Sequence, residues 1–304
     1  MSMQFTRRNV IRMGALAAVG LGLGGSRGAG AATPALIRRA IPSSGEQIAV
    51  IGLGTTGFGV GAPDEVAARR AVLKRLVDAG ASVVDTAPAY GESETVLGGL
   101  IAELGVRDKV FLATKITRAA NFEESLRRLR TDHLDLLQVH SLQGTETLLP
   151  LMLEWKAAKR IRYLGVTTSR GSQHDELIDT MRRHPLDFIQ VNYSLGDRDA
   201  AGTLLPLAHD RGIAVLVNIP FGGPRGRNLF RQVSGKNLPP WAADLGIASW
   251  GQFFLKYVIS HPAVTCAIPG TTRLEHLEDN LAGGIGILPS ESVRKKMESL
   301  WDSL

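Results

Sequence analysis

The sequence predicts a single-domain (β/α)8 TIM barrel, preceded by a cleavable signal segment. The chain has 304 residues, which is enough for one large α/β domain with a substantial core. Short apolar runs recur at intervals of ~24–29 residues between positions 81 and 214, a period that fits one strand, one helix and two short loops. Continuous apolar character, as in residues 110–113, is typical of parallel strands buried on both faces.

Eight apolar runs mark the expected barrel strands. They begin near Ile48, Ala81, Val110, Leu134, Arg162, Phe188, Ala214 and Thr265. Apolar residues at helical spacing in 123–130 and 249–259 indicate helices between strands, and residues 290–304 are expected to form a closing amphipathic helix. The seventh unit contains an extra Gly- and Pro-rich loop, residues 221–240, and long loops in compact domains are usually functional.

The N-terminal 31 residues have the pattern of a targeting segment. Arg7 and Arg8 precede an uncharged run rich in Ala, Gly and Leu, and an A-x-A site follows at 29–31. The paired arginines resemble a twin-arginine signal, whose pathway exports folded proteins. We therefore expect a signal peptide over 1–31 that meets the export machinery, a linker over 32–45 and the barrel over 46–304, in an exported, periplasmic or otherwise extracytoplasmic protein.

Charge and cysteine content exclude several classes of protein. The formal net charge is +6, but residues 1–31 contain four arginines and no acidic residue, which leaves +2 on the remainder. With positive and negative charges nearly balanced, residues 32–304 lack the excess of positive charge that binds DNA or RNA. No nucleic-acid partner is therefore expected. The single cysteine, Cys266, excludes an intrachain disulfide and a cysteine-rich metal site. We expect a monomer.

A glycine motif near the start of the barrel suggests a competing fold. Residues 52–57 spell G-x-G-x-x-G after an expected strand, and Asp85 ends the next strand, where a dinucleotide-binding Rossmann fold places a ribose-binding acid. That fingerprint needs its third glycine in the first turn of a helix. Here helix signals begin only at Asp64, so the motif is better explained as a tight turn from strand to loop at the barrel mouth.

Ionisable side chains end three successive strands, and a tyrosine follows the first. The residues are Asp85, Tyr90, Lys115 and His140. The carboxyl ends of barrel strands meet at one mouth, where such enzymes place their chemistry. A free tyrosine has a pKa of about 10, and a nearby ammonium favours its phenolate, which makes the phenol usable for proton transfer. We expect Lys115 to supply that charge, Asp85 to orient Lys115, and His140 to polarise a carbonyl oxygen beside Tyr90.

At these residues the chain resembles the aldo/keto reductase family, from about Ile41 to Asn280. The matching stretches are residues 84–94 (VDTAPAYGESE), 113–115 (ATK), 139–140 (VH), 161–166 (IRYLGV), 190–193 (QVNY) and 268–271 (IPGT). The resemblance implies a barrel that reduces a small-molecule aldehyde or ketone to an alcohol without a metal. It further implies hydride transfer from a nicotinamide cofactor, with Tyr90 as the proton donor.

The resemblance also implies cofactor-binding positions, and several depart from the family pattern. Gln190 matches a glutamine that binds the nicotinamide carboxamide, whereas threonines replace a Ser-Asn pair and Asn218 replaces a stacking aromatic that Phe221 is expected to supply. At the phosphate end, Gly270 and Thr271 replace a Lys-Ser pair, and His276 replaces an arginine. Arg273 is expected to bind the phosphate in their place. NADPH is preferred on family grounds, with NADH as the other option. The full set is Thr167, Thr168, Gln190, Asn218, Phe221, Gly270, Thr271, Arg273, His276, Asp279 and Asn280.

Two other functions are compatible with parts of the pattern. A nicotinamide-binding barrel could act as a non-catalytic redox sensor or partner subunit, as the substitutions at Thr168 and Asn218 suggest. A metal-dependent barrel hydrolase using His140 and Asp85 is disfavoured, because no second strand-end histidine exists and Lys115 would repel the ion. The sequence does not encode the substrate.

Overall fold

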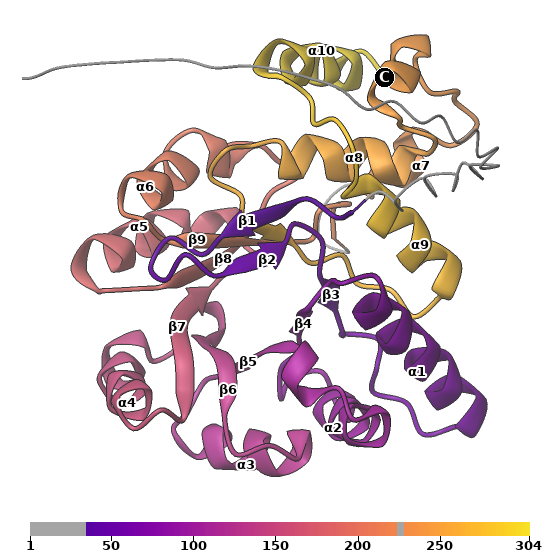
Figure 1. Ribbon diagram of the computed structural model, residues 1–304. Helices are drawn as coiled ribbons and strands as arrows, with labels where there is room; N and C mark the ends of the chain where they lie inside the picture. The colour runs from indigo at the N-terminus through magenta and orange to yellow at the C-terminus, as the bar shows by residue number, and fades with distance from the viewer. Residues whose placement is uncertain (1–34, 224–227) are drawn as a thin grey trace, which may run out of the picture. The chain divides into compact units, whose positions relative to one another are not determined.

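Eight parallel strands form the barrel that the sequence predicts, with helices packed around its outside (Figure 1). The computed structural model describes residues 35–223 and 228–304. The expected signal peptide, residues 1–31, lies outside the described residues. The strands are β1 (Arg38–Ala40), β2 (Gln47–Ala49), β3 (Leu53–Gly54), β4 (Val83–Asp85), β5 (Phe111–Ile116), β6 (Leu134–Val139), β7 (Ile161–Thr167), β8 (Phe188–Asn192), β9 (Ala214–Asn218) and β10 (Cys266–Ala267).

Helices alternate with the barrel strands. They are α1 (Pro63–Asp78), α2 (Ser93–Leu104), α3 (Ala120–Leu129), α4 (Thr145–Ala157), α5 (His174–Arg183), α6 (Leu204–Asp210), α7 (Leu229–Gln232), α8 (Trp250–Ile259), α9 (Leu274–Gly283) and α10 (Glu291–Asp302). Ser249 and Ser290 cap α8 and α10, since each side-chain oxygen accepts a backbone N–H of the first turn. The long loop of the seventh unit contains α7, and residues 224–227 within it are not described.

The barrel strands follow one another in chain order from β3 to β10. Parallel bridges from Ile51 to Ala267 and from Gly54 to Gly270 bring the first and last strands together. One apolar cluster fills the inside of the barrel, and a larger one lies between the strands and the helices. The strands β5 and β6 are buried along their whole length, which explains why they are predominantly apolar.

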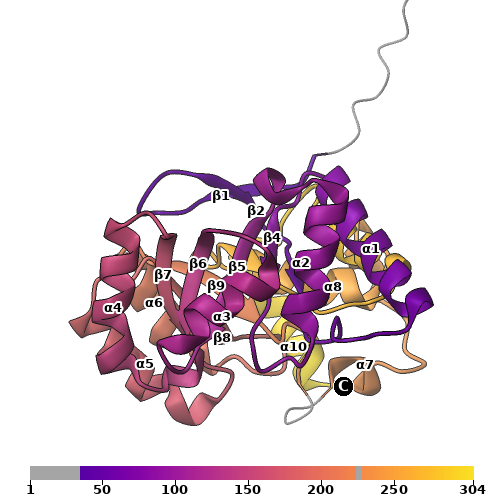
Figure 2. The ribbon, with the colours of Figure 1, turned by 90° about the horizontal axis from the view of Figure 1, so that it is seen from below.

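An antiparallel hairpin of β1 and β2 covers the amino end of the barrel (Figures 1 and 2). Here the prediction was wrong in one respect, because the run beginning near Ile48 belongs to this hairpin and the first barrel strand, β3, starts at Leu53. Ile41 and Ile48 are fully buried in the cluster inside the barrel, so the hairpin has the apolar residues expected of a barrel strand. The segment expected to be a linker, residues 32–45, contains β1, so the folded body begins before residue 46.

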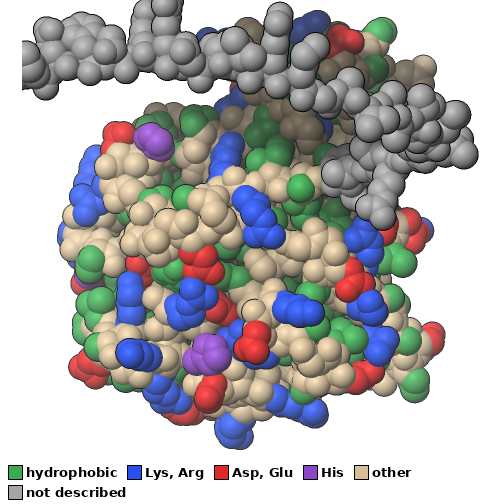
Figure 3. Space-filling model, in the orientation of Figure 1, with side chains coloured by type: hydrophobic (Ala, Val, Ile, Leu, Met, Phe, Trp, Pro, Cys, Tyr) green, Lys and Arg blue, Asp and Glu red, His purple; other side chains and the backbone are tan. Residues whose placement is uncertain are grey.

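Charges of both signs are interspersed on the face of the molecule that Figure 3 shows. Among the described residues, no helix is both long and apolar enough to cross a membrane. The described part of the chain also contains no group of three or more His, Cys, Asp and Glu side chains placed to hold a metal ion.

Candidate active site

Parallel strand order brings three of the predicted residues to one mouth of the barrel. Asp85 is the last residue of β4, Lys115 lies near the end of β5, and His140 directly follows β6. These three strands are adjacent in the barrel. Their carboxyl ends lie at the end of the barrel opposite the β1–β2 hairpin (Figure 2). Tyr90 lies in the short loop between β4 and α2, close to the same three residues.

Lys115 and Asp85 form a buried ion pair below the mouth. The Lys115 Nζ donates to Asp85 Oδ2 at 2.6 Å and to the Thr86 carbonyl oxygen at 2.8 Å. Lys115 is 1% exposed and Asp85 is 2% exposed. Burial alone would lower the pKa of Lys115, but the Asp85 carboxylate and the Tyr90 oxygen outweigh it and raise that pKa above its ordinary value. The ammonium is therefore charged throughout the neutral range.

Tyr90 and His140 lie on the solvent side of this pair, and both are half-buried. The Lys115 Nζ is 5.2 Å from the centroid of the Tyr90 ring. The Tyr90 and His140 rings meet edge to face with 6.3 Å between their centroids. Burial and the Lys115 charge lower the pKa of His140 to about 4. The mouth therefore holds a charged ammonium, a phenol and a neutral imidazole within one small volume.

Two buried glutamines complete the surroundings of Asp85. Gln138 Nε2 donates to Asp85 Oδ1 at 3.3 Å, and Gln190 Nε2 donates to Asp85 Oδ2 at 3.4 Å. Gln138 is a neighbour of the site that we did not predict. Its position two residues before His140 was the available signal, because side chains two apart in a strand point to the same face.

The carboxamide end of the predicted cofactor site has two unsatisfied buried acceptors. Among the described residues, Gln190 Oε1 and Asn218 Oδ1 have no hydrogen-bond partner. Asn218 Nδ2 donates to the Thr168 carbonyl oxygen at 3.0 Å, and the Thr168 backbone N–H donates to the Gln190 carbonyl oxygen at 2.9 Å. Buried acceptors without partners are rare and costly, and an amide NH2 group is one donor that would satisfy them. These residues therefore fit the carboxamide of a nicotinamide.

The predicted threonine pair is placed differently from an amide-binding pair. Thr167 ends β7 and is buried. The Thr168 hydroxyl donates to Gln173 Oε1 at 2.7 Å, and Gln173 Nε2 donates to the Ser141 carbonyl oxygen at 3.1 Å. The Thr168 hydroxyl hydrogen is thus used inside the protein. Gln173, which we did not predict, links the loops after β6 and β7.

Most of the remaining predicted cofactor residues lie on α9 or on the loop between β10 and α9. Gly270 lies beside Gly54 in the bridge that closes the barrel. The Thr271 hydroxyl accepts the Arg273 backbone N–H at 3.2 Å, and the exposed Arg273 guanidinium pairs with Glu275. Exposed pairs of this kind contribute little, so Arg273 is free to exchange Glu275 for a phosphate. His276 is also exposed.

Asp279 and Asn280 lie further along α9. Asp279 accepts hydrogen bonds from the Ser249 hydroxyl and from Gln252 Nε2, so in this structure it ties α9 to the start of α8. Asn280 is buried. On the seventh-unit loop, the half-buried Phe221 packs against Phe230 with 5.1 Å between ring centroids.

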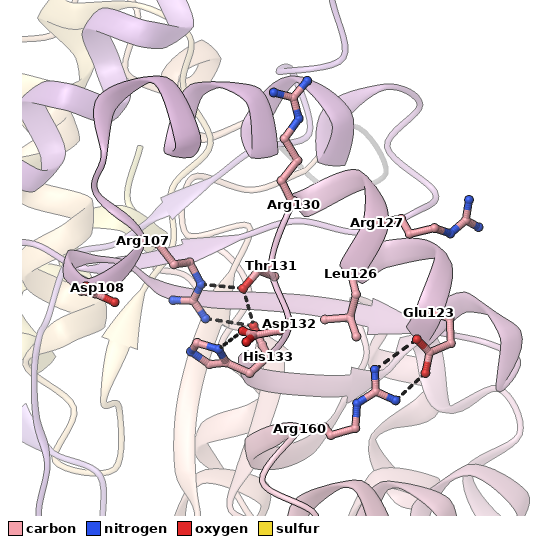
Figure 4. A pocket seen from close by; sticks show the side chains of 10 residues that line it. All are labelled: Arg107, Asp108, Glu123, Leu126, Arg127, Arg130, Thr131, Asp132, His133 and Arg160. Carbon is pink, nitrogen blue, oxygen red and sulfur yellow. Dashed lines mark hydrogen bonds and ion pairs between the residues drawn. The ribbon is translucent and has the colours of Figure 1, made fainter.

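A separate hollow lies at the opposite end of the barrel, where β5, β6 and β7 begin (Figure 4). Arg107 donates to Thr131 Oγ1 at 3.0 Å, and Arg160 pairs with Glu123. Arg127 and Arg130 also line the hollow, and their guanidinium groups extend in different directions. None of the site residues predicted from the sequence lines this hollow, so the mouth around Lys115 remains the candidate site.

Comparison with known proteins shows which family this chain is similar to. A model of the aldo/keto reductase family matches residues 50–300. The chain is 37% identical over 202 residues to the aldo-keto reductase YhdN of Bacillus subtilis (strain 168), a match that spans 58% of this chain and 60% of that protein. It is 32% identical over 263 residues to the methylglyoxal reductase YeaE of Escherichia coli (strain K12), with 81% of this chain and 89% of that protein covered.

A similar solved structure is an aldo/keto reductase from Klebsiella pneumoniae in complex with NADP and acetate. It has a TM-score of 0.71 and 29% identity, over 84% of this chain and 93% of the other. The family model covers most of the chain, and the second relative is matched over most of both lengths. The chain therefore belongs to the aldo/keto reductase family, a family of nicotinamide-dependent oxidoreductases.

Proposed function

We propose that this protein reduces an aldehyde or ketone to the alcohol with NADPH, and that Tyr90 donates the proton. The observation that supports this most directly is the buried Lys115–Asp85 pair beneath Tyr90. A buried ion pair is costly to form, and such pairs concentrate at functional sites. The matched relatives are named as reductases, which favours a catalytic protein over a non-catalytic sensor.

The ammonium of Lys115 stabilises the charge left on Tyr90 when its proton leaves. An ammonium has three N–H donors. Two of them are taken by Asp85 Oδ2 and the Thr86 carbonyl oxygen, so the third is available to the Tyr90 oxygen. Asp85 keeps the ammonium charged and fixes its direction, and two glutamine amides hold Asp85 in turn.

His140 assists by binding the substrate oxygen. Its pKa of about 4 leaves the imidazole neutral at physiological pH, so one ring nitrogen has a hydrogen to donate to a carbonyl oxygen. The neighbouring Lys115 charge disfavours a second positive charge there. His140 therefore polarises and positions the carbonyl, while Tyr90 supplies the proton.

Gln190 and Asn218 would hold the nicotinamide through their unsatisfied oxygens, and Arg273 would bind the 2′-phosphate that distinguishes NADPH from NADH. When bound, the nicotinamide supplies the hydride. The preference for NADPH is supported by the Klebsiella structure, which contains NADP.

A binding and turnover measurement tests this function. Purified protein is titrated with NADPH and with NADH while tryptophan fluorescence is followed, and a panel of aldehydes is then added. Methylglyoxal belongs in the panel because one relative is named for it. We expect saturable binding, tighter for NADPH, and aldehyde-dependent oxidation of the cofactor. Binding without turnover of any aldehyde or ketone would contradict the proposal.

Export by the twin-arginine route is a further part of this proposal. It is supported by the Arg7-Arg8 pair, the weakly hydrophobic run and the A-x-A site in residues 1–31. That route accepts folded proteins, so the barrel could leave the cytoplasm with its cofactor bound. Replacing both arginines by lysine should stop periplasmic accumulation, whereas undiminished accumulation would argue for another route.

A further inference from the structure

The glycine-rich loop after β3 has a different task from the dinucleotide binding that its motif suggests. The loop runs from Gly54 to α1, which begins only at Pro63. No helix N-terminus therefore stands directly behind the glycines to bind a pyrophosphate. Instead, the loop packs against the chain segment that contains Asp85 and Tyr90.

Buried hydroxyl groups attach the start of this loop to that segment. The Thr55 backbone N–H and hydroxyl both donate to the Asp85 carbonyl oxygen, at 3.0 and 2.9 Å. The Ser93 hydroxyl, three residues after Tyr90, donates to the Thr55 carbonyl oxygen at 2.8 Å. Thr55 and Ser93 are fully buried, so water does not compete for these bonds.

Gly59 brings the end of the loop directly against the backbone of Tyr90. A Cβ atom at Gly59 would lie 2.8 Å from the Tyr90 carbonyl oxygen and 3.0 Å from the Glu92 amide nitrogen. Ordinary contacts begin at 3.4 Å, so the two segments would have to separate by about half an ångström. The loop cannot move away from Tyr90 freely, because its residue Phe58, next to Gly59, is fully buried in the core.

We propose that Gly59 is a positioning residue for the reaction: it lets the loop after β3 support the Tyr90 backbone and so sets the phenol relative to Lys115. The inference rests on the proposed reductase function. It concerns the proton donor and not the cofactor, because the contacts of Gly59 are with the Tyr90 loop. Displacing a reacting group by a fraction of an ångström costs rate while the binding of other groups is preserved.

The test compares Gly59→Ala with Gly61→Ala in the full chain. Gly61 lies in the same loop and has φ outside the left-handed range, and no heavy atom of the described residues lies within 4 Å of a Cβ placed there. We expect Gly59→Ala to lower kcat for aldehyde reduction about tenfold and to shift the pH dependence of kcat. The Kd for NADPH should stay within twofold of the wild-type value. Gly61→Ala should match the wild type in all three measurements.

A second variant removes support without adding bulk. Ser93→Ala deletes the hydroxyl that joins the two segments, and we expect it also to lower kcat with little change in the Kd for NADPH. Thermal unfolding followed by circular dichroism shows whether each variant is folded at the assay temperature. If Gly59→Ala does not fold, Ser93→Ala decides the question by the same measurements.

The outcomes separate this inference from the function on which it rests. A wild-type protein without reductase activity would overturn both. If the wild type is active and Tyr90→Phe is inactive, but folded Gly59→Ala reduces aldehydes as fast as Gly61→Ala, the inference alone is overturned. The same holds if Gly59→Ala weakens NADPH binding as much as it lowers kcat, because the loop would then support the cofactor.

Discussion

Replacing Lys115 by methionine tests the central electrostatic feature of the site. The substitution keeps most of the side-chain volume but leaves Asp85, which is 2% exposed, with two glutamine amides at 3.3 and 3.4 Å and no cation. Removing one partner of a buried ion pair costs about 3–5 kcal/mol. Domains typically have 5–15 kcal/mol of stability, so the free energy of unfolding in urea should fall measurably. We also expect kcat for aldehyde reduction to fall by about 10²–10⁴-fold, because Tyr90 loses the charge that assists proton transfer.

A double variant separates the structural loss from the chemical one. Lys115→Met combined with Asp85→Asn contains no buried charge at this position, so we expect most of the lost stability to return, to within about 2 kcal/mol of the wild type. Reduction should stay lost, because the ammonium is still missing. If the double variant is no more stable than Lys115→Met alone, then the unpaired carboxylate is not the cause of the instability and the reasoning fails.

The same pair predicts how stability depends on pH. Because the pKa of Lys115 is raised, the contribution of the pair to the free energy of unfolding should be full at neutral pH and be lost only as the pH rises beyond about 10.5.

Three further predictions concern single side chains. Tyr90→Phe should lower kcat by about 10²–10⁴-fold and leave the Kd for NADPH unchanged by fluorescence titration; near-normal turnover would contradict its role as proton donor. Gln190→Leu removes an acceptor proposed for the carboxamide and should weaken NADPH binding about tenfold, so an unchanged Kd would argue against that contact. The pKa of about 4 for His140 means that the unfolded chain binds this proton more readily than the folded chain, so stability should decline as the pH falls from about 6.5 towards 4. An NMR titration should place the His140 midpoint near pH 4, and a midpoint near 6.5 would show that the imidazole is solvated.

The barrel was predictable because its strands are short, continuous apolar runs at a regular spacing. Burial on both faces imposes that pattern, and β5 and β6 are buried along their whole length. The same physical rule explains the error at Ile48. A hairpin that covers the end of a barrel also buries aliphatic side chains, so composition alone does not distinguish β2 from a barrel strand. The pairing partner of a strand is a long-range property that a single run does not encode.

The juxtaposition of ionisable residues was predictable for a topological reason. Parallel neighbours place their carboxyl ends together, so Asp85, Lys115 and His140 had to share a mouth once the strands were assigned. The neutral groups were harder to foresee. The spacing of Gln138 and His140 indicates a shared face, but it does not show that Gln138 bonds to a carboxylate two strands away. Gln173 and Ser93 also bond to residues that are remote in sequence.

These neutral contacts explain how a buried ion pair can be stable and still serve proton transfer. Each oxygen of Asp85 accepts an amide hydrogen, and Oδ2 also accepts one from Lys115. The carboxylate therefore accepts three hydrogen bonds, and only one of them uses an N–H group of Lys115. With a second N–H on the Thr86 carbonyl oxygen, the ammonium is fixed in orientation while its third N–H remains available at the mouth. A pair that served stability alone would gain more from satisfying all three, so this arrangement favours a role in assisting Tyr90.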